Sequence, residues 1–324
     1  MRDMAIRSEI ERDEGAADAQ LMARVCWNYF KEGLTQETIA QQLGFTRKRV
    51  NRILNDARTN GFVQIAINSP YGACMELEAG LRQKYELRHA IVVPVASEET
   101  DVRTLVGAAA GKYISDNLRP GATLGISWGG TINSAAQNIV RRQAAENKVV
   151  LMCGGLSKST QINPFDNASL FSRALDATCY YMTAPLIAAS ESLREALVES
   201  EPIRSVLNMV QEIDLALLSA IDLSEQSKAL EYDVISQEAC TSLRAAGAVG
   251  DVCGHYLDAS GATVAHPLVR CIVHPQLDQL RAIPELVLAA GGVHKVPIIQ
   301  GAIRAGLCHV LITDEKAAAA LLQS

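Results

Sequence analysis

Apolar side chains recur between residues 35 and 54 at the three- and four-residue spacing of two short amphipathic helices. Gly44 lies between the helices, where a turn needs a residue that tolerates positive φ, and the small Ala40 allows the second helix to approach closely. Thr35 and Thr46 precede the helices as predicted N-caps. This pattern predicts a helix-turn-helix with the inward side chains Ile39, Ala40, Leu43, Val50, Ile53 and Leu54.

The second predicted helix carries many cations away from its apolar stripe. Arg can bridge guanine O6 and N7, Asn can pair with adenine, and the first residues of a recognition helix reach base edges in the major groove. A charge run is often only a solvated face. Here the spacing, the turn glycine and the caps agree, which favours DNA binding. The predicted DNA-binding surface comprises Thr35 and Gln36, then Thr46, Arg47, Lys48 and Asn51 near bases, and Arg49, Arg52 and Arg58 nearer phosphates.

The segments on either side complete a predicted winged helix-turn-helix domain over residues 18–70. A helix beginning at Asp18 and ending near Gly33 would turn Leu21, Val25, Cys26, Tyr29 and Phe30 inward. Residues 62–68 alternate with the period of a strand and predict a wing. Pro and Gly then punctuate the chain near residue 70, where we place the domain boundary. Residues 1–17 lack periodicity and predict a disordered tail.

In residues 71–324, after a predicted connecting helix over 74–85, short apolar strand patterns alternate with helical patterns. Strand patterns occur at 90–95, 123–127, 149–153, 178–183, 215–220, 249–255, 286–290 and 310–313. Helical patterns occur at 101–118, 131–145, 165–177, 191–210, 236–245, 293–305 and 314–322. Strands separated by helices predict an α/β domain with a largely parallel sheet.

Composition agrees with a soluble, two-domain protein of 324 residues, 48% of them hydrophobic. The net charge of −6 is uneven: residues 19–70 carry seven Lys or Arg against three Asp or Glu, and residues 71–324 carry 20 against 27. Such a cationic head suits a module that binds DNA at one end. The eight cysteines form neither a CxxC pair nor a Cys/His cluster, so we expect free thiols, no metal and no cofactor. Neither a membrane span nor a secretory signal is apparent, and we expect a cytoplasmic protein.

Glycine-rich loops after strands are the candidate ligand site, because α/β folds bind ligands beyond the carboxyl ends of their strands. The stretch GISWGGT (125–131) opens a helix whose N–H groups could hold a phosphate, although an ordinary strand-to-helix turn fits equally well. In GDVCGHY (250–256), Asp251 could accept from sugar hydroxyls or merely cap a loop. Lys295 could neutralise a phosphate or be solvated, and His255 and His294 are as readily structural.

These motifs, with CGG (153–155), APLI (184–187) and the terminal AGGVHK…AIRAGLCHVLITDEKAAAALL, together resemble the SorC family of bacterial transcriptional regulators over nearly the whole chain. The resemblance implies a DNA-binding head and a Rossmann-like α/β effector domain similar to glucosamine-6-phosphate deaminase and ribose-5-phosphate isomerase. It also implies a phosphorylated sugar effector and a homo-oligomer, often a tetramer. In this resemblance the phosphate loop is Ser127, Gly129, Gly130 and Thr131, beside a wall of Gly154 and Gly155, with Asp251 at sugar hydroxyls and Lys295 at phosphate or an anomeric oxygen.

One segment departs from the family pattern. An NPN-like run is common after CGG, whereas this chain keeps Asn163 and Pro164 but continues with Phe165 and Asp166. The sugar is therefore not specified by the resemblance.

Three functions are compatible with these residues. The first is a non-enzymatic regulator that binds double-stranded operator DNA as a dimer or tetramer and responds to a small sugar phosphate. The second is a sugar-phosphate isomerase or deaminase with a DNA-binding head, for which Asp251 is the one candidate base. In the third, the effector is an unphosphorylated polyol or a sugar acid, since a carboxylate suits the same N–H groups and lysine.

Overall fold

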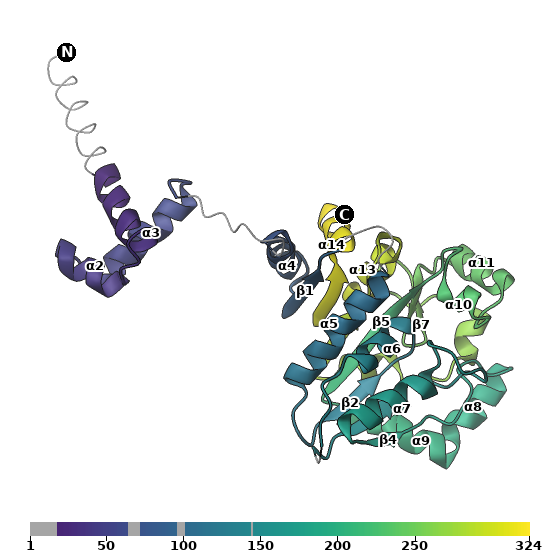
Figure 1. Ribbon diagram of the computed structural model, residues 1–324. Coiled ribbons are helices and arrows are strands. Elements are labelled where there is room, and N and C mark those ends of the chain that lie inside the picture. The colour runs from purple at the N-terminus through teal and green to yellow at the C-terminus, as the bar shows by residue number, and fades with distance from the viewer. Residues whose placement is uncertain (1–17, 64–71, 96–100, 144) are drawn as a thin grey trace. The chain divides into compact units, whose positions relative to one another are not determined.

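The computed structural model describes residues 18–63, 72–95, 101–143 and 145–324 (Figure 1). The chain divides into two compact units, residues 1–68 and 69–324, which are called the head and the body below. Within the described residues, no helix is long and apolar enough to cross a bilayer.

The head consists of a helix over residues 18–30, α2 (Gln36–Leu43) and α3 (Arg47–Thr59). Both predicted N-caps are confirmed: the Thr35 hydroxyl accepts from Thr38 N at 3.1 Å, and the Thr46 hydroxyl accepts from Arg49 N at 3.3 Å. Gly44 ends α2 with φ of 69°, in the left-handed conformation expected of the turn glycine. The helices enclose a small core, whose fully buried members include Val25, Ile39, Val50 and Ala57.

Two predictions for the head fail or go untested. Tyr29 and Phe30 were expected to point inward, but they are 37% and 38% exposed and pack edge to face at 5.0 Å. They lie in the last turn of their helix and stack on each other there.

The predicted wing strand is not present at Phe62 and Val63, which form a bend held by the bond from Val63 N to Ala57 O. Its remaining residues, 64–68, lie outside the described part of the chain.

In the body, the described strands form a sheet in the order β1-β9-β8-β5-β2-β3-β4, and every neighbouring pair on this path is parallel. The predicted parallel α/β architecture is confirmed. These strands are β1 (His89–Val93), β2 (Thr123–Ile126), β3 (Lys148–Leu151), β4 (Thr178–Tyr180), β5 (Leu215–Asp222), β8 (Glu285–Ala289) and β9 (Val310–Asp314).

Helices cover both faces of the sheet, as Figure 1 shows, and alternate strand residues enter two separate cores. Leu215 and Leu217 of β5 pack on one face, and Ala216 and Leu218 pack on the other. The first core is completed by α5 (Val102–Asn117), α6 (Gly130–Gln137), α7 (Pro164–Leu175) and α11 (Gln237–Ala245). The second is completed by α4 (Gly72–Tyr85), α9 (Glu201–Asn208), α12 (Leu277–Arg281), α13 (Val296–Arg304) and α14 (Glu315–Gln323).

The predicted single strand over 249–255 is wrong. The chain instead forms an antiparallel hairpin of β6 (Gly250–Val252) and β7 (His255–Leu257), which extends the sheet from the end of β5. Its two-residue turn, Cys253 and Gly254, has φ of 54° and 87°. Two consecutive positive φ values are the geometry that tight hairpins require, and a cysteine gives no warning of it.

Two helix predictions also need correction. The pattern over 191–210 forms α8 (Glu191–Glu199) and α9, separated at Ser200 because Pro202 starts a new helix but cannot continue an old one. The helix predicted for 131–145 ends at Gln137, where the Asn138 side chain caps it by donating to Ser134 O at 2.8 Å. Short helices at α10 (Lys228–Glu231) and α12 were not predicted.

Candidate functional site

The predicted DNA-binding side chains lie on the outer surface of the head. Val50, Ile53, Leu54 and Ala57 form the buried stripe of α3, so the side of the helix centred on Lys48 and Arg52 faces away from the core. Eight of the predicted residues are exposed and Gln36 is half-buried; the exposed ones are Thr35, Thr46, Arg47, Lys48, Arg49, Asn51, Arg52 and Arg58. Sequence reasoning missed Asn55, which is exposed one turn beyond Asn51.

Arg49 differs from its neighbours on α3. Its guanidinium lies 4.1 Å from the centroid of the Phe45 ring, a cation–π contact that holds the side chain beside the turn. Arg47 and Lys48 have no such contact within the described residues, so their long side chains are freer to reach a partner.

In the body, three adjacent parallel strands bring the predicted effector loops to one edge of the sheet. β2 neighbours β5, and β5 neighbours β8, so the loops after all three strands emerge side by side. The loop after β2 contains Ser127 to Thr131, β5 ends at Asp222, and the loop after β8 leads to Lys295. The structure therefore unites segments separated by more than 160 residues of sequence.

Ser127 and Gly129 position the loop after β2. The buried Ser127 hydroxyl accepts from Ser219 N at 3.1 Å, and the Ser219 hydroxyl donates to Trp128 O at 2.5 Å. Gly129 has φ of 122°, and a Cβ there would lie 2.8 Å from Ser219 Oγ. The glycine is thus required both by its backbone conformation and by the close approach of β5.

Gly130 and Thr131 open α6, which has no side-chain N-cap. Within the described residues, the N–H groups of Gly130, Thr131 and Ile132 have no hydrogen-bond partner. By contrast, α7 and α8 are capped by Asn163 and Ser190. Free N–H groups and the helix dipole make the start of α6 suited to an anion.

Cations and carboxylates surround this helix start. Lys295 is 7% exposed; burial lowers its pKa, and nearby Asp222 partly offsets that effect. The Arg103 guanidinium lies 3.6 Å from where a Cβ of Gly130 would stand. Arg103 also pairs with Asp101 at 3.0 Å, and Lys228 pairs with Glu231. Each cation thus has an acidic neighbour, so the free N–H groups of α6 are the distinctive anion-binding feature.

Asp222 was missed by sequence reasoning. It is 5% exposed at the end of β5, its Oδ2 accepts from Ser224 N at 3.0 Å, and its Oδ1 lies 3.8 Å from His294 Nε2. An aspartate ending a buried strand was the available signal, but only the sheet order brings it close enough to Lys295 to raise the pKa of that lysine.

Asp251 lies in β6 and is 1% exposed. The Trp128 indole N–H donates to its Oδ2 at 3.1 Å, and its Oδ1 has no partner within the described residues. Burial raises the pKa of Asp251 to about 7, against the opposing effect of the Trp128 bond. The carboxyl is therefore linked through Trp128 to the loop that opens α6.

Gly154 and Gly155 have contacts that explain why they are glycines. Gly154 N donates to Val273 O, and Gly155 N donates to Ala184 O. A Cβ on Gly154 would lie 2.3 Å from Pro185 O, and one on Gly155 would lie 1.9 Å from the Phe165 ring. The pair therefore has a packing role, and its predicted contact with an effector stays a prediction.

Comparisons with known proteins agree with this arrangement. Residues 69–323 match the family described as "Putative sugar-binding domain". The chain is 30% identical to the transcriptional regulator LsrR of Escherichia coli O9:H4 (strain HS), over 99% of this chain and 100% of that protein. It is also 30% identical to LsrR of Klebsiella pneumoniae, over 94% of each chain.

The chain belongs to the SorC family of transcriptional regulators. Among solved structures, the full-length sorbitol operon regulator SorC of Klebsiella pneumoniae superposes with a TM-score of 0.74 at 24% identity, covering 94% of this chain and 98% of that one. A DeoR family regulator of Listeria monocytogenes gives a TM-score of 0.72 at 24% identity, over 77% and 99% of the two chains. These two likenesses show the shared fold.

The family match to a sugar-binding domain covers the body. That part of the chain contains α6, Asp222, Asp251 and Lys295. Sequence reasoning had named Asp251, Lys295 and the start of α6. It missed Asp222, Arg103, Lys228 and Trp128, because their relevance depends on neighbours distant in sequence.

Proposed function

We propose that this SorC-family protein regulates a carbohydrate catabolic operon by binding operator DNA through its head and a small phosphorylated sugar through its body. The observation that carries the effector assignment is the uncapped start of α6, with the buried Lys295 and the Arg103 guanidinium nearby. Backbone N–H groups and a cation are the usual holders of a phosphate. Asp222, at the end of β5, supplies an acceptor for sugar hydroxyls, and the predicted contact of Asp251 with them stays a prediction.

The outward side of α3 supports the DNA assignment. Arg47, Lys48 and Asn51 are exposed at its start, where the residues of a recognition helix meet base edges. A head of this size contacts few bases, so the protein acts as a homo-oligomer, a dimer or tetramer, that places two heads on half-sites about one helical turn apart. An effector that binds the two head arrangements unequally shifts DNA occupancy.

Enzymatic turnover of a sugar phosphate, the second reading of the sequence, has less support. The relatives are named as transcriptional regulators. A general base needs reach to its substrate, and Asp251 is enclosed beneath Trp128. The similarity of the body to the deaminase and isomerase folds stays a prediction.

A thermal-shift screen tests the effector assignment. Sugar phosphates are compared with the matching free sugars, polyols and sugar acids, since a ligand at 100 times its Kd adds about 2.7 kcal/mol to the free energy of unfolding. We expect stabilisation by one phosphorylated sugar and little by its dephosphorylated form.

The matched variants are Lys295→Ala and Lys112→Ala, because Lys112 is a surface cation of α5 with a 77% exposed side chain. In Lys295→Ala, the loss of a charge-assisted hydrogen bond should weaken binding of the phosphorylated ligand by about 10-fold or more. Lys112→Ala should bind like the wild type. Equal binding of the phosphorylated and free sugar, unchanged by Lys295→Ala, would contradict a phosphate at this site.

A further inference from the structure

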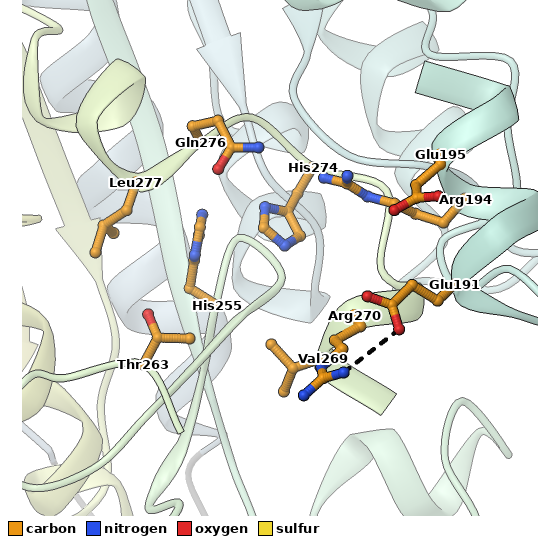
Figure 2. A pocket seen from close by; sticks show the side chains of 10 residues that line it. All are labelled: Glu191, Arg194, Glu195, His255, Thr263, Val269, Arg270, His274, Gln276 and Leu277. Carbon is orange, nitrogen blue, oxygen red and sulfur yellow. Dashed lines mark ion pairs between the residues drawn. The ribbon is translucent and has the colours of Figure 1, made fainter. Parts of the chain in front are cut away.

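A cavity of about 320 Å³ lies in the body, and none of the residues that line it belongs to the loops after β2, β5 and β8 (Figure 2). The β6–β7 hairpin separates the two places. Asp251 pairs with Tyr256 and Val252 pairs with His255, and side chains of adjacent residues in a strand point to opposite faces. Asp251 therefore faces Trp128 on one side, and His255 faces the cavity on the other.

Two buried histidines line this cavity. His255 and His274 are 3% and 8% exposed, and their ring centroids are 4.0 Å apart. His255 Nε2 lies 3.0 Å from Pro275 O, and His274 Nδ1 lies 2.7 Å from the same oxygen. Because a carbonyl can only accept, each of these nitrogens carries a proton and donates.

The opposite ring nitrogens, His255 Nδ1 and His274 Nε2, must then be acceptors. They have no partner within the described residues. Burial lowers the pKa of His255 to about 3 and that of His274 to about 4, so both rings stay neutral at physiological pH. The cavity thus offers two fixed, neutral acceptors to a ligand that carries donors.

Charged side chains at the rim of the cavity balance one another. Glu191 and Glu195 of α8 face Arg194 and Arg270, as Figure 2 shows. Arg270 lies 3.5 Å from Glu191, and Arg194 Nε donates to Ile272 O at 3.3 Å, which leaves its terminal N–H groups available. The two cations and two anions cancel, and the imidazoles are neutral, so the cavity does not favour a charged ligand. These side chains supply hydrogen-bond donors and acceptors in similar number.

We propose that this cavity is a second small-molecule site, which binds an uncharged polyol or sugar. Hydroxyl groups donate to His255 Nδ1, His274 Nε2 and the Glu195 carboxylate, and Arg194 donates to a hydroxyl oxygen. The volume lies at the small end of the range of about 300 to 1,000 Å³ typical of ligand pockets, which suits a monosaccharide-sized molecule. The site is independent of the proposed phosphate at α6.

Titration of the full-length protein with sorbitol, glucose and myo-inositol tests the site, with imidazole ¹⁵N NMR as the readout. The chain contains only six histidines, so the signals of His255 and His274 can be assigned by single substitution. We expect the free protein to show His255 protonated on Nε2 and His274 on Nδ1. At least one of the three probes should shift the unprotonated nitrogens of both rings in a saturable manner.

Two variants locate the binding. Glu195→Ala removes an exposed side chain at the rim. It should weaken binding of the probe by about 10-fold, the usual effect of losing a hydrogen bond to a charged group. His274→Leu, checked for folding by its methyl spectrum, should abolish the shift at His255. Lys295→Ala should leave probe binding unchanged.

Three results would overturn the site: no saturable shift with any probe into the tens of millimolar, a shift unaffected by Glu195→Ala, or binding that Lys295→Ala abolishes. The last result would place the ligand at α6 and leave the proposed regulatory function intact. Conversely, failure of the sugar-phosphate screen would not affect the polyol site.

Discussion

The head and the body present their candidate sites in opposite ways. In the head, Arg47, Lys48 and Asn51 follow one another on a single helix and point to solvent. In the body, Arg103, Asp222 and Lys295 come from three distant segments, and the latter two are almost fully buried. An exposed local surface can be altered with little effect on folding, whereas a buried site made of distant segments couples ligand binding to the stability of its domain.

The largest effect should come from the buried carboxyl of Asp251, whose pKa of about 7 lies well above its unfolded value. Its folded form retains a proton that the unfolded chain releases above about pH 4. The resulting stability is present below about pH 4 and lost as the pH rises through 7, at up to about 1.4 kcal/mol per unit. Asp251→Asn, which can still accept from Trp128, removes this dependence.

Measurement of urea unfolding from pH 4 to 8 checks that prediction. The difference in stability between Asp251→Asn and the wild type should increase with pH up to about 7 and then level off. The comparison with the wild type is needed because His255 and His274, with lowered pKa values, add stability as the pH rises over part of the same range. A difference independent of pH would show that Asp251 is ionised throughout.

A pair of glycine substitutions contrasts the two regions directly. Gly155→Ala places a Cβ 1.9 Å from the Phe165 ring, and overpacking of this kind should destabilise the body by about 3 kcal/mol. Gly44→Ala meets no atom within 4 Å and suffers only from its φ of 69°, so it should destabilise the head by about 1 kcal/mol. Chemical denaturation of both variants measures these losses. A larger loss for Gly44→Ala would reverse the contrast.

Arg47→Ala probes the exposed surface alone. It should weaken specific DNA binding by about 1 to 3 kcal/mol and relax the preference at one base, while the melting temperature stays unchanged. Arg24→Ala is the matched control, because Arg24 is exposed on the helix that precedes α2. Gel-shift titrations against an operator and a scrambled duplex distinguish the outcomes. If Arg47→Ala leaves the ratio of the two affinities unchanged, Arg47 does not read a base.

The contrast also explains how far the sequence could be interpreted. The caps Thr35 and Thr46, the turn at Gly44 and the strands of the parallel sheet follow from local patterns, and the structure has them. The hairpin turn at Cys253 could not be predicted from a local pattern, because positive φ at a cysteine has no sequence signature. Nor could local spacing reveal that Tyr29 and Phe30 remain exposed, since the helical period does not show where a neighbouring helix ends.

Within the body site, prediction from sequence stopped at single residues. Lys295 and Asp251 were recognisable as charged groups in glycine-rich loops. Their partners Asp222 and Trp128 were not, because each pairing joins segments that meet only through the order of β2, β5, β8 and the hairpin. The same reason hid the pairing of His255 with His274 in Figure 2, whose shared acceptor is Pro275 O.

The most direct test joins the two regions in one titration. Fluorescence anisotropy would measure binding to an operator duplex selected from a random pool, with and without a saturating sugar phosphate identified by thermal shift. We predict that the ligand changes the Kd for DNA by at least about 5-fold in the wild type, the lower end of typical coupling, and not in Lys295→Ala. Superimposable isotherms for the wild type, with and without a ligand shown to be bound, would contradict effector control of DNA binding.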